Sequence, residues 1–293
     1  MPVNGSSMKY STYARCERVF FMKSAWNVLK EQIGHFYLIR RLSLYELKSK
    51  NKSNYLGMAW EVISPVIQIL IYWFVFGSIR QRANIEVVPG FEVPFIYWLL
   101  GGFVLWTFFY QAVIQGSKSI YTRLLILSKM NFPMSVIPNI VIFSQFYTHL
   151  ILLGITILIF QVSGYFVTIY FLQIFYFIFA TFFLVFAISL ITSTLSTIIR
   201  DVHMLLNATL RMLLYLSPVL WQVTILEDPL PTIMKINPLY YLIEGYRAAL
   251  FGTGWYFAEH WRYSLYFWAV AIILLLFGAR LHMKFRRHFI DYL

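Results

Sequence analysis

Three arginines are the residues of this sequence best suited to bind a phosphate group. Arg40 and Arg41 precede the first long apolar segment, and Arg211 lies inside a later one. Placing an arginine near the centre of a bilayer costs about 2.5–3.5 kcal/mol of insertion free energy, so a functional role for such a residue is expected. Its guanidinium can hold a phosphate through two parallel hydrogen bonds, which lysine cannot do. We predict that these three arginines bind a phosphate group.

Each arginine also has a simpler explanation. Arg40 and Arg41 could attract anionic lipid headgroups, which is worth about 1 kcal/mol per basic residue near the surface. Arg211 could extend its long side chain back to the inner membrane surface. Both alternatives stay open at this point.

Aromatic residues are the second chemical signal. They crowd the first two apolar segments, where the prominent ones are Tyr72, Trp73, Trp106, Phe109 and Tyr110. Aromatic faces without fixed charges could let the sugar rings of a polymer slide past, so we predict that these residues line a translocation path. The alternative is an interfacial belt of amphipathic rings with additional lipid-facing bulk.

Catalytic chemistry, by contrast, has no residues to use. No apolar segment contains Asp or Glu in its interior, no two histidines are spaced for one helical face, and Cys16 is the single cysteine. The nearest approach to a phosphate loop is Gly116-Ser117-Lys118-Ser119, which lacks the required Gly-Lys pair and the earlier glycine. We therefore expect no catalytic residue, no metal and no cofactor in this chain, so that any ATP and Mg²⁺ would be bound by a separate subunit.

Composition places these residues in a membrane protein. Of 293 residues, 60% are hydrophobic and only 12% are charged, which excludes a soluble enzyme, a disordered chain and a disulfide scaffold. The net charge of +12 fits the positive-inside bias and anionic lipids better than nucleic-acid binding. We expect contact with membrane lipids and no nucleic-acid partner.

Six segments are apolar and long enough to cross a bilayer, which needs about 20 residues. They are residues 62–79, 95–116, 136–160, 166–199, 202–223 and 263–281. Eighteen lysines and arginines fall on one side of this topology and five on the other. The asymmetry predicts an all-α integral membrane protein with six transmembrane helices and with both termini in the cytoplasm. The hydroxyl-rich end of the fourth segment is expected to line a wet cavity or to project below the membrane.

The remaining segments flank or interrupt the spans. Residues 1–25 are predicted to be a cytoplasmic tail, and residues 26–61 an interfacial amphipathic helix with its lead-in. In that helix Trp26, Ile33 and Tyr37 share one apolar stripe. Between spans five and six, residues 224–261 contain several prolines and glycines, which predicts short re-entrant helices packed within the protein.

Several short motifs, in this order along the derived topology, resemble a known family. They are Leu56-Gly57-Met58-Ala59-Trp60 with Ser64-Pro65, Lys129-Met130-Asn131-Phe132-Pro133 with Pro138, Arg200-Asp201-Val202, Ser217-Pro218-Val219, Asn237-Pro238-Leu239-Tyr240-Tyr241 and Gly245-Tyr246-Arg247. The sequence resembles the ABC-2 type permeases that export cell-surface polysaccharides, and among them the wall teichoic acid translocation permeases. Residues 62–293 would form the ABC-2 type transmembrane domain.

The resemblance implies a partner, a cargo and a location. A homodimer of permeases in the bacterial plasma membrane would associate with two copies of an ABC ATPase subunit. Together they would move a polymer on a polyprenyl diphosphate from the inner to the outer leaflet. With such a cargo, the lipid diphosphate would be recognised by Arg40, Arg41 and Arg211. The segment 118–135 would contact the ATPase, through residues that include Tyr121, Arg123, Leu124, Lys129 and Phe132.

Alternative functions also fit parts of the sequence. One is a permease of the same fold for O-antigen, for capsular polysaccharide, or for small lipids or drugs. Another is a membrane enzyme acting on lipid-linked sugars, which would need acids or histidines gathered at one membrane face. No such cluster is visible in the sequence.

Overall fold

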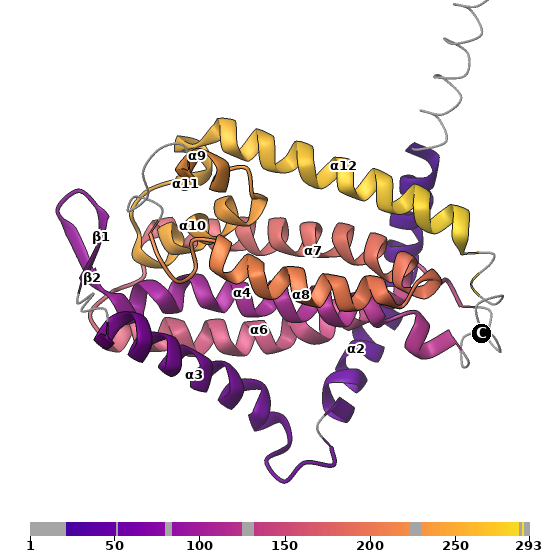
Figure 1. The fold of residues 1–293 in the computed structure, drawn as a ribbon, viewed down its shortest axis with the longest axis horizontal. Coiled ribbons are helices and arrows are strands. Elements are labelled where there is room, and N and C mark those ends of the chain that lie inside the picture. The colour runs from indigo at the N-terminus through magenta and orange to yellow at the C-terminus, as the bar shows by residue number, and fades with distance from the viewer. Residues whose placement is uncertain are drawn as a thin grey trace, which may run out of the picture.

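The protein is a bundle of long helices with a smaller group of short elements at one end (Figure 1). The computed structural model describes residues 22–50, 52–79, 84–124, 132–222, 230–286 and 289. The long helices are α3 (Trp60–Tyr72), α4 (Phe95–Lys118), α6 (Val136–Val162), α7 (Gln173–Ile198), α8 (Asp201–Leu216) and α12 (Trp261–Phe285). Helix α4 packs against both α6 and α7, and α7 packs against α12, so α4 and α7 form the centre of the bundle.

Five helical segments of the described residues are long and apolar enough to cross a membrane. They are Gly57–Gly77, Phe95–Lys118, Val136–Val162, Ile169–Ile198 and Trp261–Phe285. The predicted fifth span corresponds to α8, whose 16 residues measure about 24 Å, short of the ~30 Å hydrocarbon core. Five of the six expected segments therefore meet the criteria for a span, and the predicted fifth span stays a prediction.

The two ends of the bundle carry different elements (Figure 1). One end carries the hairpin of β1 (Asn84–Val88) and β2 (Phe91–Pro94) together with the short helices that follow α8. The other end carries α2 (Phe36–Lys50) and the last turns of α12. The cytoplasmic position of both termini remains a prediction.

The predicted interfacial helix is present but turns a different face to the protein. It comprises a helix over residues 22–34 and α2, joined at a single turn residue. Val28, Ile39 and Leu47 are buried, and α2 packs against α6. Trp26 and Tyr37, from the predicted apolar stripe, are exposed. The helix therefore has two apolar faces, one packed on the bundle and one exposed, and its position at the membrane surface stays a prediction.

The hydroxyl-rich end of α7 is packed inside the bundle. Ser193, Thr194 and Ser196 are all buried, and the Thr194 hydroxyl lies 3.1 Å from Nδ1 of His282 on α12. Several of these hydroxyls donate to backbone carbonyls three or four residues earlier, as in the bond from Thr197 to Ser193. These hydroxyls therefore do not line a cavity in this structure, because small polar residues let α7 approach its neighbours closely. The other alternative, that this end of α7 projects below the membrane, stays a prediction.

Short helices occupy the segment between α8 and α12, as its prolines and glycines predict. They are α9 (Leu230–Met234), α10 (Pro238–Phe251) and α11 (Tyr256–Glu259). Asn237 caps α10 by accepting a hydrogen bond from the Leu239 amide, and Gly252 ends it in the left-handed conformation with φ of 68°. Their depth in the membrane stays a prediction.

A fully buried arginine fixes α10 to the bundle. Arg247 pairs with Glu244 at 2.7 Å and donates hydrogen bonds to the carbonyl oxygens of Trp98 and Val219. Its guanidinium carbon lies 3.5 Å from the centre of the Trp98 ring. Gly102 leaves the necessary space, because a Cβ there would lie 2.5 Å from an Arg247 nitrogen. Arg247 is one of the five basic residues that the sequence analysis placed on the outer side, and the sequence did not predict its burial.

Candidate translocation site

A cavity of about 370 Å³ between α3, α4 and α8 gathers most of the residues predicted for the translocation path. Tyr72 comes from α3, Trp106 and Tyr110 from α4, and Arg211 from α8. The sequence analysis assigned the arginine and the aromatics separately, and the fold places them around one space. The exposed Arg211 thus faces the cavity that the aromatics line.

Helical spacing explains why each helix contributes a continuous strip to this cavity. Gln68 precedes Tyr72 by one turn on α3, and Tyr215 follows Arg211 by one turn on α8. Phe103 lies one turn before Trp106 on α4. These additional lining residues, with Leu214, were not predicted. The i, i+3 and i+4 pattern around the predicted residues was the signal that could have identified them.

Contacts among the rings fix the shape of the cavity wall. Trp106 and Tyr110 are stacked with ring centroids 6.1 Å apart, and Tyr72 meets the ring of Phe103 edge-on at 5.6 Å. The Tyr110 hydroxyl donates to Oδ1 of Asn207 at 2.9 Å, which ties α4 to α8. The wall is therefore a set of aromatic rings in contact with one another.

The lining is suited to sugars and phosphates and carries no acid. Its described residues combine aromatic rings, one amide and a single cation, without a carboxylate. Rings and amides bind a polyhydroxylated ligand by stacking and hydrogen bonding, and the guanidinium can hold a phosphate oxygen pair. Proton-coupled transport would require a titratable acid that this cavity does not provide among those residues.

Two predicted path residues do not line this cavity. Phe109 is buried in the hydrophobic core with 2% of its surface exposed, and it packs against Trp106 from behind. Trp73 is 40% exposed and begins the π-helical segment η2 (Trp73–Ile79). Each directly adjoins a lining residue in the sequence, Tyr110 or Tyr72, and successive residues of a helix point in different directions. The prediction of path-lining roles is not supported for these two residues.

The predicted coupling residues lie at the end of the bundle that carries α2. Tyr121 and Arg123 form the short helical turn η3 (Tyr121–Arg123) directly after α4. Tyr121 is partly exposed, and its partial burial raises the pKa of its hydroxyl. Arg123 pairs with Glu46 of α2 and also donates to the Ser119 carbonyl oxygen at 3.0 Å.

Leu124 and Phe132 are less accessible than their predicted contact with the ATPase would require. Leu124 is buried in a small cluster with Ile120, Ile137 and Phe289, so its side chain is not available to a partner in this conformation. Phe132 is partly buried against the same cluster. The apolar side chains of this segment stabilise its own docking on the bundle. Lys129 lies outside the described residues.

Arg40 and Arg41 are exposed on α2 and do not line the translocation cavity. Neither forms an ion pair with any residue that the structure describes. Both guanidinium groups are consequently accessible from the surface of the interfacial helix. Their predicted role in diphosphate recognition stays a prediction.

The fold and this cavity define a class of protein: a multi-span helical membrane protein with a cavity lined by aromatic residues and one arginine. Residues 37–251 match the ABC-2 type transporter family. The chain belongs to this family, and it is a multi-pass integral membrane protein of the bacterial plasma membrane.

Curated relatives align with most of the chain. An O-antigen export system permease protein from Klebsiella pneumoniae is 24% identical over 272 residues, covering 90% of this chain and 98% of the relative. A protein of the same description from Myxococcus xanthus is 23% identical over 228 residues, covering 76% of this chain and 84% of the relative. The resemblance predicted from the short motifs is thereby confirmed at the level of the family.

Proposed function

We propose that this chain is the permease subunit of an ABC exporter for a cell-surface polysaccharide. Its cargo is a polymer carried on a polyprenyl diphosphate, which moves from the inner to the outer leaflet. The observation that carries the proposal is the cavity in which Tyr72, Trp106 and Tyr110 surround a space that Arg211 also faces. Aromatic faces suit successive sugar rings, and the guanidinium suits the diphosphate or phosphates within the polymer.

The polymer is a polysaccharide of the O-antigen kind or a wall teichoic acid. The names of the relatives favour O-antigen, since they describe O-antigen export and align over most of the chain. The teichoic acid alternative rests on the short motifs of the sequence, and a phosphate-rich polymer would also use Arg211 repeatedly. We give O-antigen-like glycans the first place and test both.

Energy for transport comes from two copies of a separate ABC ATPase, because this chain offers no nucleotide-binding motif. The segment 118–135 is the proposed contact with that ATPase. A second copy of the permease is the proposed partner within the membrane. Exposed apolar side chains on α3 and α8, such as Leu70 and Met212, give a second copy an apolar surface to pack against.

Reconstitution tests this function directly. The permease and its ATPase are placed in proteoliposomes with either a polyprenyl-diphosphate-linked glycan or a lipid-linked teichoic acid. Delivery of polymer to the opposite leaflet is measured by its accessibility to an added lectin or hydrolase. We expect ATP-dependent export of the glycan and its loss in a Trp106→Ala, Tyr110→Ala double variant. ATP-dependent export of a small amphipathic drug without export of either polymer would contradict the proposal.

A further inference from the structure

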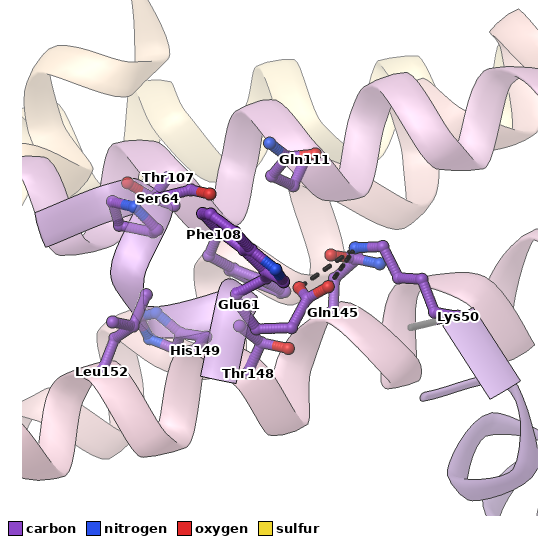
Figure 2. Close-up of a pocket in the computed structure, with 12 residues that line it drawn as sticks. Lys50, Glu61, Ser64, Thr107, Phe108, Gln111, Gln145, Thr148, His149 and Leu152 are labelled. Carbon is purple, nitrogen blue, oxygen red and sulfur yellow. Dashed lines mark hydrogen bonds and ion pairs between the residues drawn. The ribbon is translucent and has the colours of Figure 1, made fainter. Parts of the chain in front are cut away.

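A second cavity, of about 200 Å³, lies between α3, α4 and α6 and is lined largely by polar side chains (Figure 2). One face of α3 borders both cavities. Glu61, Ser64 and Pro65 line the polar cavity, whereas Gln68 and Tyr72 line the translocation cavity one and two turns further along the helix. The polar cavity therefore precedes the translocation cavity along α3, starting from the end of the helix that adjoins α2.

Several polar groups of this cavity make no hydrogen bond within the described part of the chain. Thr148 is 7% exposed, and its hydroxyl is buried without a hydrogen-bond partner among the described residues. Gln145 is 5% exposed and Gln111 is partly buried, and neither amide makes a hydrogen bond to a described residue. A buried polar group without a partner costs about 1–3 kcal/mol. One unpartnered buried hydroxyl beside two amides without hydrogen bonds, all around one space, indicates a polar ligand.

An ion pair and a tryptophan complete the lining. Lys50, at the end of α2, lies 2.9 Å from a carboxylate oxygen of Glu61, at the start of α3. Figure 2 shows this pair and Gln145 together on one side of the cavity. The Lys50 side chain is 32% exposed, so a phosphate arriving along the membrane surface can reach it and take the place of the Glu61 carboxylate. Trp60 adds an aromatic surface to the lining.

We propose that this cavity binds the phosphate-linked sugar at the lipid end of the cargo. The sugar hydroxyls form hydrogen bonds with Gln111, Gln145 and Thr148. The Lys50 ammonium group leaves the Glu61 carboxylate and pairs with a phosphate oxygen instead. The inference rests on the proposed function, because it takes the cargo to be a lipid-linked glycan. The same chemistry, a phosphate joined to a polyhydroxylated group, occurs in phosphatidylglycerol, and the experiment separates the two sources.

Binding measurements on the permease–ATPase complex in phosphatidylcholine nanodiscs test the site. The probes are a polyprenyl diphosphate carrying one N-acetylhexosamine, the same lipid without sugar, and phosphatidylglycerol. We expect the sugar to improve wild-type binding about tenfold, as expected for one or two satisfied hydrogen bonds. The Gln145→Leu, Thr148→Val double variant is expected to lose this preference and to bind the sugar-free lipid as wild type does.

Matched variants isolate each group. Ser144→Ala is the control, because the Ser144 hydroxyl is also buried and unpartnered but does not line the cavity, and it is expected to bind all probes like wild type. Lys50→Gln is expected to weaken both diphosphate lipids severalfold. Glu61→Gln, at the partly exposed mouth of the cavity, is expected to strengthen them and covers the case in which the double variant fails to fold.

The outcomes distinguish this site from the proposed function. A sugar preference that survives in the double variant overturns the site, and so does phosphatidylglycerol that competes as well as the sugar-bearing lipid. Export of polymer by a complex whose double variant binds like wild type removes the site and leaves the proposed function. If the complex shows the expected binding pattern but exports no polymer, the site is supported and the proposed function is contradicted.

Discussion

At the scale of single residues, Arg211 offers the clearest test of the translocation cavity. If it holds phosphate through a bidentate contact, Arg211→Lys should reduce export clearly and Arg211→Gln more strongly. A hydrogen bond to a charged group is worth about 1.5–3 kcal/mol, so the glutamine variant should lose at least tenfold in initial export rate. Export in proteoliposomes is the measurement. Arg262→Gln is the control, since Arg262 is exposed at the start of α12, away from the cavity lining. Equal rates for Arg211→Gln and the control would remove Arg211 from the path.

Arg40 and Arg41 allow a test of phosphate recognition against simple charge. The double substitution to lysine keeps the charge and removes the planar fork. If the pair recognises a diphosphate, export should fall while membrane insertion and assembly with the ATPase stay intact. Attraction to anionic lipid alone would predict full export, because lysine serves that purpose equally well. Export assays combined with co-purification of the ATPase decide between the two explanations.

Two adjacent glycines on α4 test the buried arginine. A Cβ at Gly102 would lie 2.5 Å from an Arg247 nitrogen, whereas one at Gly101 would meet Arg247 and Leu250 at an ordinary 3.5 Å. Gly102→Ala must displace a guanidinium held by Glu244, so we expect a loss of about 2–3 kcal/mol in stability. Gly101→Ala should be neutral or slightly stabilising. Thermal unfolding in detergent measures both, and equal midpoints would show that Arg247 moves aside freely.

At the scale of elements, α2 holds together parts of the chain that are distant in sequence. Its Glu46 pairs with Arg123 after α4, and its Lys50 pairs with Glu61 of α3. In the preceding helix, Glu31 pairs with Arg286 after α12. Exposed pairs of this kind contribute only about 0–1 kcal/mol each to stability. Their value is positional, since they fix the segment after α4 relative to the interfacial helix.

Breaking the Glu46–Arg123 pair should therefore affect coupling more than folding. Glu46→Gln and Arg123→Gln should each lower cargo-stimulated ATP hydrolysis while shifting the unfolding midpoint very little. The exchange of both residues, Glu46→Arg with Arg123→Glu, should restore part of the stimulation because the ion pair can form again. A double-mutant cycle on the stimulated rate measures this coupling. Wild-type stimulation in both single variants would exclude a role for the pair.

At the scale of the whole molecule, the arrangement of its two ends makes the orientation testable. Glu92 is exposed on the hairpin at one end, and Thr122 is exposed in η3 at the other. In a Cys16→Ser background, Glu92→Cys in intact cells should react with an impermeant thiol reagent, and Thr122→Cys should react only after lysis. This result is expected because the lysine and arginine excess lies on the Thr122 side. The reverse pattern would invert the topology.

The sequence by itself determined the class of the protein and the approximate positions of its spans. Apolar runs of about 20 residues must form helices in lipid, because no water is present to satisfy the backbone. The prolines and glycines between α8 and α12 likewise predicted short helices in that region. Tyr72, Trp106, Tyr110 and Arg211 could be selected as functional candidates because their types are unusual at such positions.

Only the tertiary structure decided which faces of these helices meet. A helix in the bundle is apolar on nearly all sides, so its periodicity does not show which side turns to a neighbour, to lipid or to a cavity. Phe109 and Leu124 illustrate this limit, since both are buried where the sequence predicted accessible side chains. The burial of Arg247 and the placement of Gln111 and Gln145 around one cavity depend on contacts between residues far apart in the chain, which local patterns do not encode.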